Sequence, residues 1–329
     1  MVCLILLSTK VTNRIHSVTV DYGPNAFPNM RNTEWQNMLQ DDIILRHLGV
    51  WSYPHAARFL PNSVVRWLQM GGWSFPQARD LYRLIFGMLV LYAVYRFARL
   101  FTGLLGAIIA MLLVSVIYPI SFENYVGQLT DPMSHLSFVL AFLFMAQEDF
   151  PFLFTTLMIG AFAKESVLAM AGFYVLFGRK DKRYPLKVAL LVPCCAAAYL
   201  GVRVMLLGGM MKYRNISGVG IENLMFNLRD HAWHYVTLLT AGALTPILAL
   251  GWKQTPIFLR RLALYLLPVL FVSSAFFSYL EETRNFMPLV IVLAVVAGYL
   301  FPKWAATSPG SSSAPESQLA VTSGGEVRR

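Results

Sequence analysis

The stretch of residues 151–187 constrains the fold more than any other part of the sequence. Two apolar runs, residues 151–163 and 166–177, flank the charged pair Lys164-Glu165, and a cluster of Lys and Arg follows at residues 179–187. Each run would form a helix of roughly 20 Å, too short to cross a hydrocarbon core of about 30 Å. The stretch is therefore either one long helix with an ion pair at its centre or a hairpin of two short helices with the charged pair at the turn.

The composition predicts an all-α integral membrane protein with many spans. Of the 329 residues, 57% are hydrophobic and 13% are charged, whereas soluble domains carry about 25% charged residues. A net charge of +10 in a soluble protein would suggest a nucleic-acid partner. In a membrane protein it indicates basic loops on the cytoplasmic face, so we expect no nucleic-acid partner.

The sequence divides into four parts. Residues 1–9 are expected to be the remnant of a first membrane helix, and residues 10–80 an interfacial region outside the cytoplasm. Within it, residues 60–70 are amphipathic and aromatic-rich, which is typical of a helix at the membrane interface. Residues 81–302 are expected to form the multi-span domain, and 303–329 a disordered tail rich in Ser, Gly and Pro. The apolar segments of the multi-span domain are expected at 81–97, 103–120, 132–146, 151–177, 186–208, 231–251, 260–280 and 286–301.

The distribution of Lys and Arg predicts the orientation. The loops at 96–99, 179–187 and 252–261 hold ten basic residues, and the loops at 121–131, 209–230 and 281–285 hold four. Cytoplasmic loops carry the excess of Lys and Arg. Only the hairpin keeps the three basic loops on one side, so we favour the hairpin. We expect a multi-pass protein of the inner (plasma) membrane, with Lys164-Glu165 toward the outer face.

In this topology the acidic residues gather at the outer face, together with a few cations. Ionisable groups at membrane depth are costly and mark functional sites. A cleft with carboxylates and cations suits a lipid-linked substrate, because the cations meet a phosphate while the tail stays in the bilayer. The residues that gather there are Asp21, Asp41, Asp42, Glu123, Asp131, Lys164, Glu165, Glu281, Glu282 and Arg284.

Each of these features also has a structural interpretation. Asp131-Pro132 is typical of a helix start. Lys164 and Glu165 could neutralise each other, and Glu282 to Arg284 could be ordinary surface charge. His135 could be a helix histidine whose hydrogen bonds are satisfied within the protein.

At these residues the chain resembles the bacterial membrane-embedded glycosyltransferases of the GT-C superfamily. The resemblance covers roughly residues 40–300. It rests on the acidic pair Asp41-Asp42 and on four short segments with the sequences RFLP (58–61), DPMSH (131–135), IGAFAKES (159–166) and ETRNFMP (282–288). It implies a polytopic helical bundle of GT-C type with a re-entrant or short-helix hairpin.

The resemblance implies transfer of a sugar from a polyprenyl-phosphate or related lipid carrier to an acceptor on the outer face. A glycan, a lipid or a protein could be the acceptor, and membrane lipids surround the site. The implied catalytic residues are Asp41 or Asp42 as the base, with Asp131 assisting or holding a divalent cation. The implied substrate- and phosphate-binding residues are Arg58, His135, Lys164, Glu165, Glu282 and Arg284.

Two other functions fit the sequence. A transporter or flippase for a lipid-linked or anionic solute would also have broken helices, but it would carry pseudo-symmetric halves and charges near the bilayer midplane. An inactive membrane assembly subunit is the third interpretation.

Overall fold

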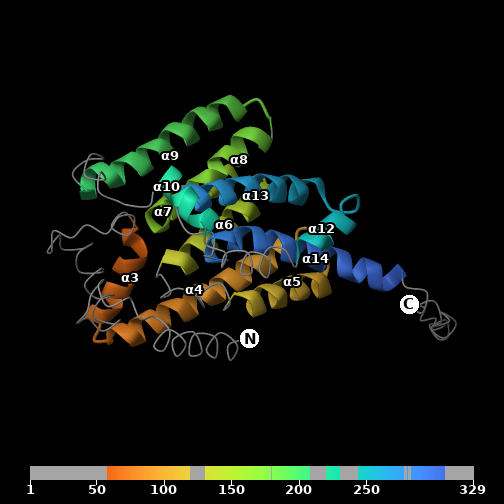
Figure 1. The fold of residues 1–329 in the computed structure, drawn as a ribbon, viewed down its shortest axis with the longest axis horizontal. Coiled ribbons are helices and arrows are strands. Elements are labelled where there is room, and N and C mark those ends of the chain that lie inside the picture. The colour runs from red at the N-terminus through yellow and green to blue at the C-terminus, as the bar shows by residue number, and fades with distance from the viewer. Residues whose placement is uncertain are drawn as a thin grey trace, which may run out of the picture.

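The computed structural model describes residues 58–118, 130–178, 180–207, 220–229, 244–277, 280 and 283–307. Throughout these ranges every regular element is a helix. Figure 1 shows α4, α9, α13 and α14 running roughly along the long axis, while α3 runs across one end. The helices are α3 (Phe59–Met70), α4 (Phe75–Ala98), α5 (Leu104–Ile117), α6 (Thr130–Ala146), α7 (Phe150–Ala163), η3 (Glu165–Leu168), α8 (Ala169–Phe177), α9 (Tyr184–Leu207), α10 (Ile221–Arg229), α12 (Thr245–Leu250), α13 (Ile257–Phe277), η6 (Thr283–Phe286) and α14 (Met287–Thr307).

The helices fall into two length classes. Four stretches are long and apolar enough to cross a membrane, namely Gln77–Ala98, Tyr184–Gly201, Ile257–Phe276 and Arg284–Ala306. Four further apolar stretches are shorter, namely Leu104–Ile117, Thr130–Ala146, Phe150–Ala163 and Glu165–Phe177. The described chain is therefore all-helical with four candidate membrane-spanning helices, in keeping with the prediction from its composition.

Several expected boundaries differ from the structure by a few residues, and two of the differences have a local cause. The helix expected from residue 81 begins at Phe75, because Ser74 and Gln77 form a capping box in which the Ser74 backbone N–H donates to Gln77 Oε1 at 3.0 Å. Residues 303–307, which were expected to begin the tail, belong to α14, which continues through Pro302 to Thr307. Residues 308–329 lie outside the described residues. The Lys303 ammonium lies 3.8 Å from the centre of the Tyr299 ring, one turn earlier. The expected first-helix remnant at residues 1–9 lies outside the described residues.

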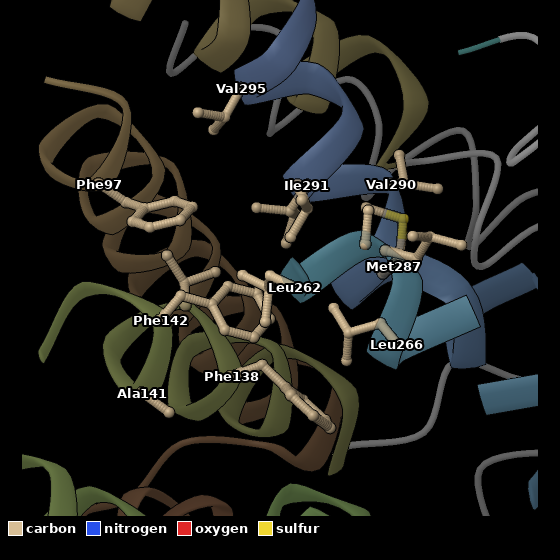
Figure 2. Close-up of a cluster of buried hydrophobic side chains, with 14 of the residues drawn as sticks. Phe97, Phe138, Ala141, Phe142, Leu262, Leu266, Met287, Val290, Ile291 and Val295 are labelled. Carbon is tan, nitrogen blue, oxygen red and sulfur yellow. The ribbon is translucent and has the colours of Figure 1, made fainter. Parts of the chain in front are cut away.

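Helix α14 forms the centre of the bundle. Its first half is apolar on every side and nearly every side chain from Met287 to Ala297 is inaccessible to solvent. Figure 2 shows Ile291 and its neighbours on α14 facing Phe97 of α4, Phe142 of α6 and Leu262 of α13. Helices α4, α6, α13 and α14 are therefore packed around one buried core.

Helices α5 and α14 approach each other so closely that only glycine fits at their contact. A Cβ atom on Gly298 would lie 2.2 Å from the Gly106 carbonyl oxygen, and a Cβ atom on Gly106 would lie 2.2 Å from the Gly298 oxygen. Small residues at such crossings let membrane helices pack backbone to backbone.

The stretch at 150–177 is interrupted, so one continuous helix is wrong. Helix α7 ends at Ala163, Lys164 is extended (φ −161°, ψ 124°), and η3 and α8 follow. The Phe150 and Tyr174 ring centres are 5.5 Å apart, whereas a straight helix would separate these residues by about 36 Å. The chain therefore turns back at Lys164, near Gly160, where a Cβ atom would lie only 2.8 Å from Val167 Cγ1 and 2.9 Å from Ser137 Cβ.

The short connections divide the bundle into two ends. We call "site end" the one that holds Arg58, Tyr118, Asp131, Lys164 and Arg284. The opposite end, which we call "basic end", holds the connections 99–103, 147–149, 178–183 and 251–256 and the last turn of α14. At the site end, α3 packs against α4, α6 and α7 through Val65, Ala78, Tyr82, Met133 and Ala163.

The glycine contact between α5 and α14 can be tested with a matched pair of substitutions. Gly298→Ala should lower the free energy of unfolding by about 1–3 kcal/mol because the added methyl group overpacks the helix contact. Gly201→Ala on α9 adds the same methyl group where nothing lies within 4 Å, and it should leave stability equal or raise it by at most about 1 kcal/mol. Thermal unfolding in detergent micelles measures both, and equal midpoints would contradict the contact.

Candidate functional site

The centre of the site end is a buried carboxylate between two cations. Asp131 has no solvent-accessible surface. The Lys164 Nζ atom lies 3.3 Å from Asp131 Oδ1, and the Arg284 Nη1 atom lies 3.3 Å from Asp131 Oδ2. Each oxygen of the carboxylate therefore faces its own cation.

The three partners come from three breaks in regular helix. Asp131 is the second residue of α6, where the free N–H groups of the helix N-terminus favour a negative charge. Lys164 is the extended residue between α7 and η3, and Arg284 lies in η6, just before α14 begins. The predicted helix start at Asp131-Pro132 is found, and the same aspartate also holds the network.

A second ion pair ties α3 to the same point. Arg58 Nε and Nη2 donate to Glu165 Oε2 and Oε1 at 3.1 and 2.9 Å, a bidentate contact. Burial alone would lower the pKa of the Arg58 guanidinium, but the facing Glu165 carboxylate raises it above its ordinary value. Arg58 therefore stays charged at the N-terminus of α3.

Lys164 and Glu165 each have a partner from another part of the chain. The extended Lys164 lies between α7 and η3, and the two neighbouring side chains reach different elements. Lys164 faces Asp131 and also donates to Asn285 Oδ1 at 2.9 Å, while Glu165 accepts from Arg58. The two ion networks meet where α7 ends.

Cations outnumber carboxylates among the described residues of this cluster. Three cations (Arg58, Lys164 and Arg284) face two carboxylates (Asp131 and Glu165), so these five side chains carry a net charge of +1. Four of the five belong to residues that are nearly or fully buried, and Glu165 is partly buried. A buried net positive charge attracts an anionic group, and a phosphate group can accept hydrogen bonds from both Lys and Arg.

His135 positions Arg284. Its Nε2 atom lies 3.0 Å from the Arg284 carbonyl oxygen, and its Nδ1 atom lies 3.1 Å from the Tyr118 hydroxyl oxygen. A carbonyl oxygen only accepts, so in the neutral ring Nε2 carries the proton and Nδ1 accepts from Tyr118. Both nitrogens of this buried ring are thus engaged by the protein, which agrees with a satisfied helix histidine and not with a direct substrate contact.

The described residues around Asp131 do not fit a divalent cation. Both of its oxygens already face a Lys or an Arg, and a metal ion would have to displace one of them. Across the part of the chain that the structure describes, no group of three or more His, Cys, Asp or Glu side chains could hold a metal.

The structure brings together six of the nine residues predicted to form the site. Arg58, Asp131, Lys164, Glu165 and Arg284 form the ion network and His135 supports it. Asp41, Asp42 and Glu282 lie outside the described residues. Two residues of the network were missed. Asn285 could have been found because it follows Arg284 directly, whereas the sequence around Tyr118 contains no signal for its role.

The charge network can be tested by a double-mutant cycle. Asp131→Asn should destabilise the protein by about 3–5 kcal/mol, because Lys164 and Arg284 would stay buried without the carboxylate. Asp131→Asn combined with Lys164→Met should recover part of that loss, with a coupling energy of about 0.5–3 kcal/mol. Unfolding in micelles of Asp131→Asn, Lys164→Met and the double variant gives the coupling energy.

The matched control for this cycle is Asp181→Asn, which removes a carboxylate that pairs with Lys187 at the basic end. Because this pair is partly exposed, the change should cost at most about 1 kcal/mol. An Asp131→Asn variant as stable as Asp181→Asn would contradict the buried network.

Comparison with protein family models, with curated proteins and with solved structures finds no match for this chain.

Proposed function

We propose that the chain is a membrane glycosyltransferase that moves a sugar from a lipid-phosphate carrier to an acceptor on the extracytoplasmic face. The observation that carries the proposal is the buried, net-cationic network of Arg58, Asp131, Lys164, Glu165 and Arg284 at three helix breaks. A lipid-linked phosphate is an anion that can reach such a site from within the membrane and bind its cations. The resemblance of these same segments to GT-C enzymes supports the proposal.

The helix lengths support a recessed site near one membrane surface. Helices α4 and α9 have 24 residues each, whereas α6 has 17 and α7 has 14. At about 1.5 Å per residue the long helices reach about 36 Å, and α6 and α7 only about 21–25 Å from the basic end. Across a hydrocarbon core of about 30 Å, Asp131 and Lys164 would lie roughly 5–10 Å below the far surface. We infer that α7 and α8 form a re-entrant hairpin.

The proposed orientation follows from the Lys and Arg at the basic end. Among the described residues, the ten cations there are Arg96, Arg99, Lys180, Lys182, Arg183, Lys187, Lys253, Arg260, Arg261 and Lys303, against the acids Glu148, Asp149 and Asp181. Cytoplasmic ends carry such an excess. The site end would then face outward in the plasma membrane, and α3 would lie at its interface with Trp67 and Trp73 exposed.

In the proposed reaction the acceptor hydroxyl attacks the anomeric carbon of the lipid-linked sugar. A carboxylate, for which Asp41 or Asp42 is the candidate, takes the hydroxyl proton. The new bond joins the acceptor oxygen to the anomeric carbon, and the bond from that carbon to the phosphate oxygen breaks. The lipid phosphate leaves with the bonding electron pair, and Lys164 and Arg284 stabilise the charge that develops on it.

Asp131 would act through these two cations. Because each of its oxygens faces one of them, it fixes where their N–H groups lie before the substrate arrives. In the same way, His135 holds the Arg284 backbone through the Arg284 carbonyl oxygen. Asn285 holds the Lys164 ammonium by accepting its hydrogen bond. Donors that are held in place before the reaction need no reorganisation in the transition state.

One observation favours a second candidate function. Buried charges at broken helices are also typical of secondary transporters, which bind substrates near the bilayer midplane. The estimated depth of Asp131 and Lys164, nearer one surface than the midplane, favours the transferase over a transporter or flippase for an anionic solute.

The proposal is tested by a transfer assay on the purified protein in lipid nanodiscs. A panel of polyprenyl-phosphate-linked sugars is supplied with membrane glycans as acceptors, and release of lipid phosphate is measured. Arg284→Lys keeps the charge but loses the planar fork of donors, so it should lower the rate at least tenfold, about 1.4 kcal/mol in the barrier. Arg229→Gln, at an exposed position of α10, should stay within twofold. Release from none of the sugars, or an unchanged Arg284→Lys rate, would contradict the proposal.

The orientation is tested by single cysteines in a background without Cys3, Cys194 and Cys195. Lys182→Cys lies at the basic end. Arg229→Cys lies at the site end, where Asn227 of the same helix donates to the carbonyl of Ala275 near the end of α13. A membrane-impermeant thiol reagent should label Arg229→Cys in intact cells, and Lys182→Cys only after the membrane is opened. Labelling of both in intact cells, or the reverse pattern, would reject this orientation.

A further inference from the structure

The basic end carries a cluster of cations that the proposed transferase reaction does not use. It consists of Lys180, Lys182, Arg183, Lys187, Arg260 and Arg261. The first four belong to the connection between α8 and α9 and the start of α9, and the last two lie in the first turns of α13. We call this set the basic cluster.

The end of α8 brings the two parts of the basic cluster together. Phe177 is the last residue of α8, and the Arg261 guanidinium of α13 lies 5.5 Å from the centre of its ring. The rings of Tyr174 on α8 and Tyr184 on α9 are 5.9 Å apart, and the rings of Phe173 on α8 and Phe258 on α13 are 5.8 Å apart. Helix α8 therefore contacts both α9 and α13 at this end.

Cations outnumber acids around the cluster. The Asp181 carboxylate lies 2.7 Å from Lys187 Nζ, and Glu148 and Asp149 lie at the same end. Among the described residues, the six cations of the cluster therefore stand against three carboxylates. The positive charge is concentrated where the helices leave the membrane.

Arg260 and Arg261 are held in place by aromatic rings. The Arg260 guanidinium lies 5.4 Å from the centre of the Trp252 ring, and its Nε atom is buried without a hydrogen-bond acceptor among the described residues. An arginine that stacks on a ring loses less freedom when it binds a planar or tetrahedral anion, because its donors are already oriented.

An exposed apolar stripe continues from Arg261 toward the middle of the bundle. Ile257, Arg261 and Leu264 lie on one face of α13, because residues three and four apart are neighbours on a helix. Leu264 is 56% exposed, and Leu267 and Phe271 farther along are 47% and 41% exposed. A ligand that binds here meets cations at the membrane edge and an apolar surface running into the membrane from them.

We propose that the basic cluster is a binding site for an anionic phospholipid, whose phosphate lies at Arg260 and Arg261 and whose acyl chain lies along the exposed stripe of α13. A zwitterionic lipid brings an ammonium group that the surrounding cations repel. A free phosphate leaves the stripe without a partner. The lipid binds independently of the transferase activity.

The test uses the purified full-length chain in micelles of a neutral detergent. Phosphatidylglycerol, phosphatidylcholine with the same acyl chains, or inorganic phosphate is added, and the thermal unfolding midpoint is followed against concentration. Phosphatidylglycerol should raise the midpoint at a concentration at least tenfold lower than phosphatidylcholine. Arg260→Gln with Arg261→Gln should raise the phosphatidylglycerol concentration needed for the half-maximal shift at least tenfold. The reason is that each cation near an anionic lipid surface strengthens binding several-fold.

The controls separate the site from a general charge effect. Arg229→Gln removes one cation from the site end and should leave the phosphatidylglycerol response unchanged. Arg260→Lys with Arg261→Lys keeps the charge and should retain part of the response. Native mass spectrometry counts the lipid molecules that each variant retains. This second readout compares lipid binding between variants even where a substitution lowers the unfolding midpoint itself. Equal effects of both lipids, a phosphate effect equal to that of phosphatidylglycerol, or an unchanged response in the Gln variant would each overturn the proposal.

Discussion

The buried carboxylate of Asp131 is the interaction on which the site end depends. Three segments end or begin beside it: α6 starts there, α7 stops at the neighbouring Lys164, and α14 begins just after Arg284. A charge without solvent is tolerated only when it is paired, so these three chain breaks must stay in register with one another. Arg58 and Glu165 then add α3 to the same point, and the charge network thus organises four elements that the apolar core alone would not align.

The same network explains why the short helices are short. In a membrane, irregular backbone is tolerated only where other protein groups bury it. Lys164 is extended, yet its side chain and its neighbour are engaged by Asp131, Asn285 and Arg58. The chain can therefore turn back within the bundle. The charged site and the helix break are two results of one set of contacts.

The sequence predicted the membrane class, the break near Lys164 and most residues of the charge network, because charges inside apolar segments are rare enough to be informative. It could not predict which cation meets which carboxylate, since this depends on the extended backbone of one residue. It also could not distinguish core helices from peripheral ones. In the apolar windows of α14 and α9, 78% and 11% of the residues are buried, yet both read as apolar segments, because lipid and protein interior favour the same side chains. Tyr118 and the Gly106–Gly298 contact were missed because neither has a local signal in the sequence.

The spacing of the charged partners along the chain has a consequence for biogenesis. Lys164 follows Asp131 after 33 residues, but Arg284 follows only after 153. Because a membrane protein is synthesised from its N-terminus, α6 enters the bilayer long before its second cation exists. The Asp131 carboxylate therefore has both of its cations only once the chain up to α14 has been made. Insertion of the last helix thus both closes the core and completes the charge balance, so a chain truncated before Arg284 would lack the two features that mark the finished protein.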